Sequence, residues 1–353
     1  MSHRLIFTNN TQLNNTNYIS GSGVGAVSAS SRAALKRRSN VNATTGLRCC
    51  DNVKDDYIHF VAVATNGTNR VMTSYDGITW TPQAAVQANS WSSVTYGNGL
   101  FVAVATNGTN RVMTSPDGQT WTPQAAAEAN AWTSVTYGNG LFVAVAASPS
   151  TGSNWVMTSS NGITWTPRAA ANNLLWTSVA YGNGLFVAVA ANGTNRVMTS
   201  PNGVTWSSPS TDPPANAWIS VTYGTVNGNG LFVAVSFSIA SNQVMTSPDG
   251  QTWTPRAAAQ ANVWNSVTYG NGLFVAVAST GTNRVMTSPD GQTWTPRAAA
   301  EANAWNSVTY GNGLFVAVAK SGTNRVMTSP DGITWASGAA AEANTWNSVT
   351  YRP

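Results

Sequence analysis

The sequence predicts an all-β protein, a seven-bladed β-propeller with four antiparallel strands per blade and an irregular amino-terminal arm. Two observations predict it: a unit that begins with tryptophan recurs along the chain, and the chain ends in a strand that the first unit lacks. The lead tryptophans lie 41, 44, 42, 46, 41 and 41 residues apart and are Trp91, Trp132, Trp176, Trp218, Trp264, Trp305 and Trp346. This period is typical of propeller blades and solenoid repeats, in which one unit cannot bury its apolar face alone.

Each repeat contains four strand-like segments separated by turn signals. In the unit that begins at Trp264, residues 266–269 and 273–278 flank a Gly-Asn-Gly hairpin signal. Residues 284–288 follow a polar loop, and residues 292–295 follow a Pro-Asp-Gly turn. The second segment, LFVAVA, is apolar throughout and suits a strand covered on both faces. Four short antiparallel strands in a repeat of this length describe a propeller blade.

The two ends of the repeat array complement each other. The first unit begins at Tyr57 directly with its second strand, and residues 346–351 (WNSVTY) form a first strand with no blade after it. Six complete units and these two fragments make seven blades. We therefore expect the carboxy-terminal strand to complete the first blade, which closes the ring and leaves no free sheet edge at the junction.

The tryptophans repeat in two series. The chain has fifteen, of which seven lead the units and seven lie in the predicted fourth strands: Trp80, Trp121, Trp165, Trp206, Trp253, Trp294 and Trp335. These fourteen are predicted to pack between blades, because each buries a large aromatic area. Trp155 alone lies outside both series.

The amino-terminal arm, residues 1–56, differs in character from the propeller of residues 57–353. Charged residues are 8% of the chain, and the net charge of +5 comes mostly from residues 1–57, which carry +4. The arm is polar, so we expect it to be extended or partly disordered. Its basic cluster, Lys36, Arg37 and Arg38, is a candidate contact with a larger assembly, an acidic protein or membrane, or more weakly nucleic acid; a solvated tether is the alternative.

Composition also limits the chemistry and the location of the protein. Cys49 and Cys50 are adjacent and lie outside the repeats, so neither a disulfide framework nor a metal-binding spacing is predicted, and no cofactor is expected. No apolar run is long enough for a membrane-spanning helix. The first residues lack the long apolar region of a secretory leader, so we expect no export by that route. An extracellular surface or a virion is the favoured location.

A turn with aspartate recurs before the second tryptophan of the unit. It reads SYDGITW from Ser74, SPDGQTW from Ser115, Ser247 and Ser288, and SPDGITW from Ser329. This turn resembles the Asp-box, or BNR repeat, of sialidase-like propellers, although it is one residue tighter than the common form, and the resemblance covers roughly residues 57–353. It implies a structural role for Asp76, Asp117, Asp249, Asp290 and Asp331, whose carboxylates accept hydrogen bonds within the turn. Asn161 and Asn202 replace Asp in two blades, which suits such a role.

The resemblance also raises the alternative of a sialidase-like glycoside hydrolase. Those enzymes use an arginine triad, a tyrosine nucleophile with a glutamate partner, and an aspartate as acid and base. Here Glu128, Glu301 and Glu342 share one repeat position, and Asp212 is the only acid of the ring outside the repeats. A catalytic site needs residues placed once that converge on one substrate. The sequence therefore predicts no catalytic residue and no enzyme.

The loops between the second and third strands are the predicted ligand-binding region. Their candidate residues are Arg111, Arg196, Arg284, Arg325, Asn110, Asn283 and Trp155. Arginine and asparagine can hold sugars or acidic groups, and an exposed Trp155 can stack on a sugar or anchor a protein. The alternatives are that each arginine stacks on the tryptophan of its own blade or on a neighbour, and that Trp155 packs within its own loop. Departures from the repeat cluster in blades three to five.

We therefore predict a non-enzymatic binding or structural module. Near-identical blades suit multivalent recognition of a carbohydrate or a protein, in which several weak equivalent sites give avidity. The arm would tether the ring to a larger assembly such as a cell surface or a virion.

Overall fold

The computed structural model of the chain describes residues 57–148, 154–210, 212–239 and 242–353. The basic cluster and the cysteine pair of the predicted arm, Lys36, Arg37, Arg38, Cys49 and Cys50, lie outside these residues. The described chain contains strands, turns and bends and no helix.

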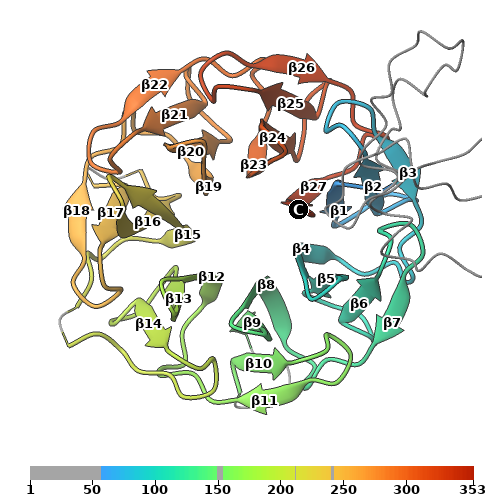
Figure 1. Cartoon of the computed structure of the whole chain (residues 1–353), viewed down its shortest axis with the longest axis horizontal. Coiled ribbons are helices and arrows are strands. Elements are labelled where there is room, and N and C mark those ends of the chain that lie inside the picture. Colours follow the sequence, from blue (N-terminus) through green and yellow to red (C-terminus); the bar gives the residue numbers. More distant parts are fainter. Residues whose placement is uncertain (1–56, 149–153, 211, 240–241) are drawn as a thin grey trace, which may run out of the picture. The chain divides into compact units, whose positions relative to one another are not determined.

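The first strand of every repeat lies on the inside of a ring of seven sheets (Figure 1). The innermost strands are β4 (Trp91–Gly97), β8 (Ala131–Gly138), β12 (Trp176–Gly182), β15 (Trp218–Val226), β19 (Trp264–Gly270), β23 (Trp305–Gly311) and β27 (Trp346–Tyr351). In each of them the register shifts just after the lead tryptophan, as between Trp264 and Ser266 in β19. Such a bulge re-aims side chains, and the two residues after the tryptophan are both partly exposed.

The second and third strands form the buried middle of each blade. The second strands are β1 (Phe60–Ala64), β5 (Leu100–Ala105), β9 (Leu141–Ser148), β13 (Leu185–Ala190), β16 (Asn229–Ser236), β20 (Leu273–Ala278) and β24 (Leu314–Ala319). The third strands are β2 (Val71–Ser74), β6 (Val112–Ser115), β10 (Val156–Ser159), β14 (Val197–Ser200), β17 (Val244–Ser247), β21 (Val285–Ser288) and β25 (Val326–Ser329). The hairpin between β19 and β20 places Asn271 and Gly272 at φ of 49° and 75°, which matches the left-handed pair of a tight two-residue turn.

The fourth strands are shorter and later than the sequence predicted. They are β3 (Thr81–Gln83), β7 (Thr122–Gln124), β11 (Thr166–Arg168), β18 (Thr254–Arg256), β22 (Thr295–Arg297) and β26 (Ala336–Gly338). The prediction of a strand over residues 292–295 was wrong because the N–H groups of Gln292 and Thr293 donate to Oδ1 of Asp290, at 2.8 and 2.9 Å. They are therefore engaged in the turn, and the ladder begins only after Trp294.

Blade four is the exception to four strands per blade. Its sheet has the order β12-β13-β14, and the fourth strand is reduced to a single bridge between Thr199 and Ser207. Pro209 stands where blade six has Arg297, which pairs with Val285. Proline has no N–H to donate to a ladder, so pairing stops one residue after it begins.

The carboxy-terminal strand closes the ring, as the sequence predicted. The sheet of blade one has the order β27-β1-β2-β3, and Phe60 lies opposite Tyr351 in an antiparallel pair. Figure 1 shows β27 on the inside of β1, in the place that β4 occupies in the next blade. The fold is a seven-bladed β-propeller.

The core lies between neighbouring blades. Each apolar cluster joins two of them; one contains Val275 and Val277 of blade six together with Trp305 and Phe315 of blade seven. All lead tryptophans are fully buried, and the second series is 7–9% exposed. Each indole N–H is also satisfied, as when Trp305 donates to the carbonyl of Glu301 at 3.0 Å. The prediction that the fourteen tryptophans pack between blades is confirmed.

Candidate binding site at the central channel

Each predicted arginine joins its own loop to a neighbouring connection through hydrogen bonds. We call the end of the ring that carries these loops and the blade-to-blade connections the connection face. Arg284 donates to the carbonyl of Gly281 in its own loop and to those of Ala302 and Asn303 in the connection to the next blade, at 2.6–3.1 Å. The equivalent residues, Arg111, Arg196 and Arg325, do the same. Each lies in its own blade, so the fold does not bring the four together.

The predicted loop asparagines belong to a second set of contacts within each blade. The carbonyl of Asn283 accepts from the side-chain amide of Asn262, and its N–H donates to Gln260. In the same way, the carbonyl of Asn110 accepts from the side-chain amide of Asn89, and the N–H of Asn110 donates to the side chain of Gln87. Where the connection has glutamate, the carboxylate accepts from the side chain of the loop asparagine; these pairs are Glu128 with Asn154, Glu301 with Asn324 and Glu342 with Asn69. The repeated glutamates are therefore engaged in loop structure.

Trp155 is not an exposed aromatic platform. It is 8% exposed and belongs to the apolar cluster between blades three and four, against which Leu174 packs. Trp155 stands at the arginine position, and Leu174 stands where the other connections have asparagine, such as Asn130. Two departures from the repeat thus replace a polar contact by an apolar one. The expectation of an exposed Trp155 was wrong; the side chain packs, but between two blades and not only within its own loop.

The five aspartates act within their own turns. In blade six, Oδ1 of Asp290 accepts from two backbone N–H groups and from the hydroxyl of Ser288. Gly291 has a φ of 70°, and Trp294 donates to its carbonyl. Asp76, Asp117, Asp249 and Asp331 make the same bonds. Asn161 accepts from the same two positions, so an uncharged oxygen can also accept these two hydrogen bonds.

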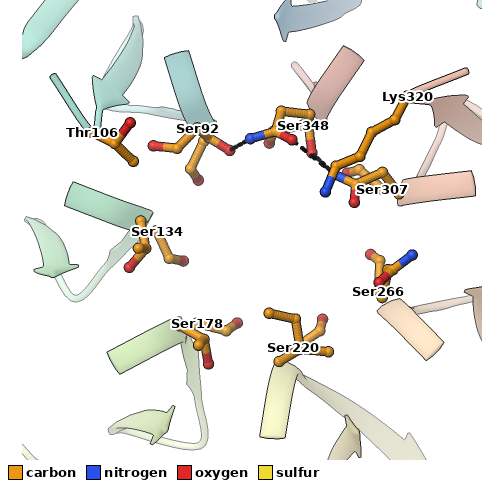
Figure 2. A pocket seen from close by; sticks show the side chains of 16 residues that line it. Ser92, Thr106, Ser134, Ser178, Ser220, Ser266, Ser307, Lys320 and Ser348 are labelled. Atoms are coloured by element: carbon orange, nitrogen blue, oxygen red, sulfur yellow. Dashed lines mark hydrogen bonds between the residues drawn. The ribbon is translucent and has the colours of Figure 1, made fainter. Parts of the chain in front are cut away.

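The innermost strands surround a cavity of about 290 Å³ at the centre of the ring (Figure 2). It is lined by the two residues that follow each lead tryptophan, together with Thr106 and Lys320 from the loops after two second strands. The lining is made almost entirely of hydroxyl and amide side chains. No carboxylate is among the lining residues.

A closed series of hydrogen bonds links the seven blades around this channel. The second residue after each lead tryptophan is a serine, and its hydroxyl accepts from a valine N–H of the next blade at 3.1–3.2 Å. The donor and acceptor pairs are Val94 with Ser348, Val135 with Ser93, Val179 with Ser134, Val221 with Ser178, Val267 with Ser220, Val308 with Ser266 and Val349 with Ser307. We call these seven residues the serine ring. Figure 2 shows six of them around the opening, with Ser92 beside them.

A second series is interrupted in one blade. The first residue after the lead tryptophan donates its side chain to a backbone carbonyl of the next blade; the donors are Ser92, Thr133, Thr177, Asn265, Asn306 and Asn347. In blade five this residue is Ile219, which packs against the neighbouring apolar cluster. Blade five therefore presents an apolar side chain to an otherwise polar channel.

Among the residues that the structure describes, Lys320 is the single charged group that lines the cavity. It lies directly after β24, where the other blades have small or uncharged residues such as Thr106. In Figure 2 its side chain extends inward from the wall toward Ser307. Its ammonium makes no hydrogen bond or ion pair with any described residue. Lys320 reaches the solvent of the channel, yet the surrounding atoms remove enough water to lower its pKa.

The channel was missed in the sequence because its residues were interpreted only as strand formers. One signal was present: a serine stands at the same position of all seven units, beside apolar residues, where a strand alone has no need of a hydroxyl. A second was that residues 57–353 contain one lysine. Among the described residues, no group of three or more His, Cys, Asp or Glu side chains is placed to hold a metal ion.

Comparisons with known proteins concern the fold. No protein-family model matches the sequence, and no curated protein matches it. Two solved structures are similar: YCF48 from Cyanidioschyzon merolae, at 15% identity over 72% of this chain and 86% of that chain with a TM-score of 0.53, and virginiamycin B lyase from Staphylococcus aureus, at 12% identity over 75% and 92% with a TM-score of 0.61.

A third similar structure is YCF48 bound to D1 peptide, at 17% identity over 71% of this chain and 81% of that chain with a TM-score of 0.52. At such identities the similarity extends to the propeller fold alone. The likeness to the Asp-box stays a resemblance of the turn, since no family model supports it. The described residues include no helix that is long and apolar enough to cross a membrane.

Proposed function

We propose that the propeller is a non-enzymatic scaffold that binds a protein partner, through a peptide segment, at the connection face beside the central channel. The observation that carries this proposal is a set of large apolar side chains in blades four and five, which we call the apolar sector: Leu175, Ile219, Phe237 and Ile239.

The apolar sector departs from the repeat toward larger and more exposed apolar groups. Leu175 is 38% exposed and Phe237 39%, and the equivalent residues in blade three are Ala131 and Ala147. Ile239, in the longer loop of blade five, is 68% exposed. Backbone hydrogen bonds from Ala191 to Leu175 and from Phe237 to Ala217 put both residues where a loop meets a connection. Large apolar residues exposed together in one region are typical of interaction sites.

The other exposed aliphatic residues do not single out a place on the ring. They follow the Asp turn at one repeat position and are Ile78, Ile163, Val204 and Ile333. Single exposed apolar residues are normal on soluble proteins. The apolar sector is confined to consecutive blades and reaches the channel through Ile219, so one side of the opening differs from the rest.

The non-enzymatic part of the proposal is supported by how the acidic residues are used. The five aspartates and the three repeat glutamates of the described chain accept hydrogen bonds from their own turns or loops. Glycoside hydrolysis usually needs two carboxyl groups that face one substrate. The structure of YCF48 with D1 peptide shows that a propeller of similar fold takes a peptide. Recognition of a glycan, and attachment to a larger assembly through residues 1–56, stay predictions.

The test is selection of peptides from a random displayed library on the full-length chain, followed by binding measurements with two variants. Phe237→Thr with Leu175→Ala introduces residues that blades two and three already have at these positions. Ile78→Gln removes an exposed aliphatic group at an Asp turn and is the matched control. We expect the first variant to weaken selected peptides at least tenfold, about 1.4 kcal/mol, and the control to bind normally.

Two outcomes would contradict the proposal. If no peptide is enriched, or if the apolar-sector variant binds the enriched peptides as well as the original chain does, the sector is not the docking surface. Turnover of a sialoside by the same preparation would favour the hydrolase instead.

A further inference from the structure

We propose that the channel opening is a carboxylate-binding site in which Lys320 and the serine ring hold a free carboxylate of the bound peptide. The inference rests on the proposed function, since it names the chemistry of the partner segment, but the site itself is argued from the channel alone.

The serine ring leaves its hydroxyl hydrogens available. Each serine oxygen accepts a valine N–H from the next blade, for example Ser307 from Val349 at 3.1 Å. None of the seven hydroxyls donates to an acceptor among the described residues. A hydroxyl has one hydrogen to donate, so the ring presents hydroxyl donors to whatever fills the channel.

Lys320 adds the only charge among the described residues that line the cavity. Its ammonium has three donors, reaches inward from the wall (Figure 2) and has no acidic partner in the described chain. Lys320 is exposed, so its ammonium can meet an anion that enters the channel and donate charge-assisted hydrogen bonds to it. Burial lowers the pKa of Lys320, and no second titratable group lines the cavity. The nearest basic contact is Arg325 of the same loop, which donates to the carbonyl of Lys320.

The balance of charge selects a carboxylate over a phosphate. One ammonium matches one negative charge, whereas sites for phosphate groups typically use arginine forks or several cations. The described lining residues include no guanidinium, and no carboxylate that would repel an anion. The apolar sector lies in blades four and five and Lys320 lies in blade seven, so an apolar side chain and a carboxylate of one peptide have separate places around one opening.

The test uses lysine labelled with ¹³C at Cε in the full-length chain. The chain has three lysines, Lys36, Lys54 and Lys320, so three signals appear and a Lys320→Thr variant assigns one of them. That substitution copies Thr106 of blade two and leaves the fold intact. Sodium acetate is the probe, acetamide is its neutral analogue, and sodium chloride at equal ionic strength controls for screening.

We expect acetate to shift the Lys320 signal saturably and to leave the other two unchanged, with acetamide and chloride inactive. Acetate binding to the two Lys320 variants is measured through the chemical shifts of backbone amides near the channel. Lys320→Arg should still give a saturable response to acetate, whereas Lys320→Thr should weaken the affinity for acetate at least tenfold. Equal effects of chloride, or tighter binding of inorganic phosphate than of acetate, would overturn the proposal.

Two peptide series separate the sources of the carboxylate. Peptides from the library selection are compared with their carboxy-terminal amides, and internal Asp or Glu residues are changed to Asn or Gln. Loss of affinity in the first series identifies a chain terminus, and loss in the second an acidic side chain. If acetate binds and no peptide does, the scaffold proposal fails and the anion site stands; if peptides bind equally with and without any carboxylate, the anion site fails alone.

Discussion

The guanidinium of Arg352 lies over the aromatic ring of Tyr96, 5.4 Å from its centre, at the junction between the last and first parts of the chain. In the next blade the equivalent place is Gly97, where a Cβ atom would lie 2.1 Å from Cγ of Tyr137. At six such glycines the tyrosine ring of the following blade packs directly on the glycine backbone. At the junction the chain does not turn back as a hairpin, so a long side chain can lie over the tyrosine.

Deletion of residues 346–353 should strongly destabilise the propeller. It removes β27 from the sheet of blade one and with it Trp346, which is fully buried; loss of one such side chain alone costs about 3–5 kcal/mol. Arg352→Gly, which removes the stacking on Tyr57 and Tyr96 and a hydrogen bond to the carbonyl of Pro116, should cost less, about 0.5–1.5 kcal/mol. Thermal unfolding followed by near-ultraviolet circular dichroism measures both. An unchanged melting temperature after the deletion would argue against closure by this strand.

Gly270 and Gly272, two glycines of one hairpin, should respond differently to alanine. Gly270→Ala places a Cβ 2.0 Å from Cγ of Tyr310, whereas Gly272 has open space around it but a φ of 75°. Gly272→Ala should therefore cost about 1 kcal/mol of backbone strain, and Gly270→Ala should cost more because a packed tyrosine must move. Urea unfolding at equilibrium compares them. Equal midpoints would show that the tyrosine relaxes freely.

Asp290→Asn should leave stability nearly unchanged, and Asp290→Ala should cost about 1 kcal/mol, by analogy with side chains that cap backbone N–H groups. The reason is that Asn161 already accepts the same two hydrogen bonds at 2.9 and 3.0 Å. Melting temperatures at neutral pH test this pair. A large loss with asparagine would mean that the turn needs the charge.

Acid should destabilise the ring through its five turn aspartates. Partial burial by itself raises the pKa of Asp290, but hydrogen bonds from Thr293, Gln292 and Ser288 outweigh it and lower the pKa below the ordinary value. A lowered pKa in the folded state gives stability that is complete above the unfolded pKa, about 3.9, and is lost as the pH falls through the folded value. The melting temperature should therefore fall below about pH 4. Replacement of all five by asparagine should flatten this decline.

The apolar contact between blades three and four should appear as coupling between two substitutions. Trp155→Arg and Leu174→Asn each restore the common residue of the repeat and each remove apolar packing from the same cluster. The double variant should be less unstable than the sum of the single ones by about 0.5–1.5 kcal/mol. A double-mutant cycle in urea measures this. Strict additivity would show that the two side chains act independently.

The architecture was accessible from the sequence because it depends on repetition. The lead tryptophans fix the period, and the orphan strand at residues 346–351 reveals both the number of blades and the way the ring closes. The turn aspartates were also accessible, since Asn161 and Asn202 exclude roles that need a carboxylate. These features are either local turns or regular repeats, and both can be recognised in the amino-acid sequence without the fold.

The binding site was harder to predict because it forms between blades. In the sequence Arg284 looks like a cation available for a ligand. Only the fold shows that its guanidinium donates hydrogen bonds to three backbone carbonyls. Trp155 looks exceptional until Leu174, from the next connection, is found in the same cluster. Ser348 and Val94 are 254 residues apart, yet they are hydrogen-bonded at 3.2 Å. Contacts of this kind form only when the blades are assembled in the ring, so the sequence alone does not reveal them.

The sharing of one blade between distant segments also affects how the molecule is made. During synthesis on the ribosome, six inner strands can pair with their neighbours as soon as a hairpin emerges, because two residues separate them. β1 has no such neighbour and must wait until residue 351 has been translated. For that whole interval an apolar strand with an unpaired edge is accessible to other nascent chains. The final pairing spans nearly the entire propeller, so it is the step most exposed to aggregation and most sensitive to temperature during expression.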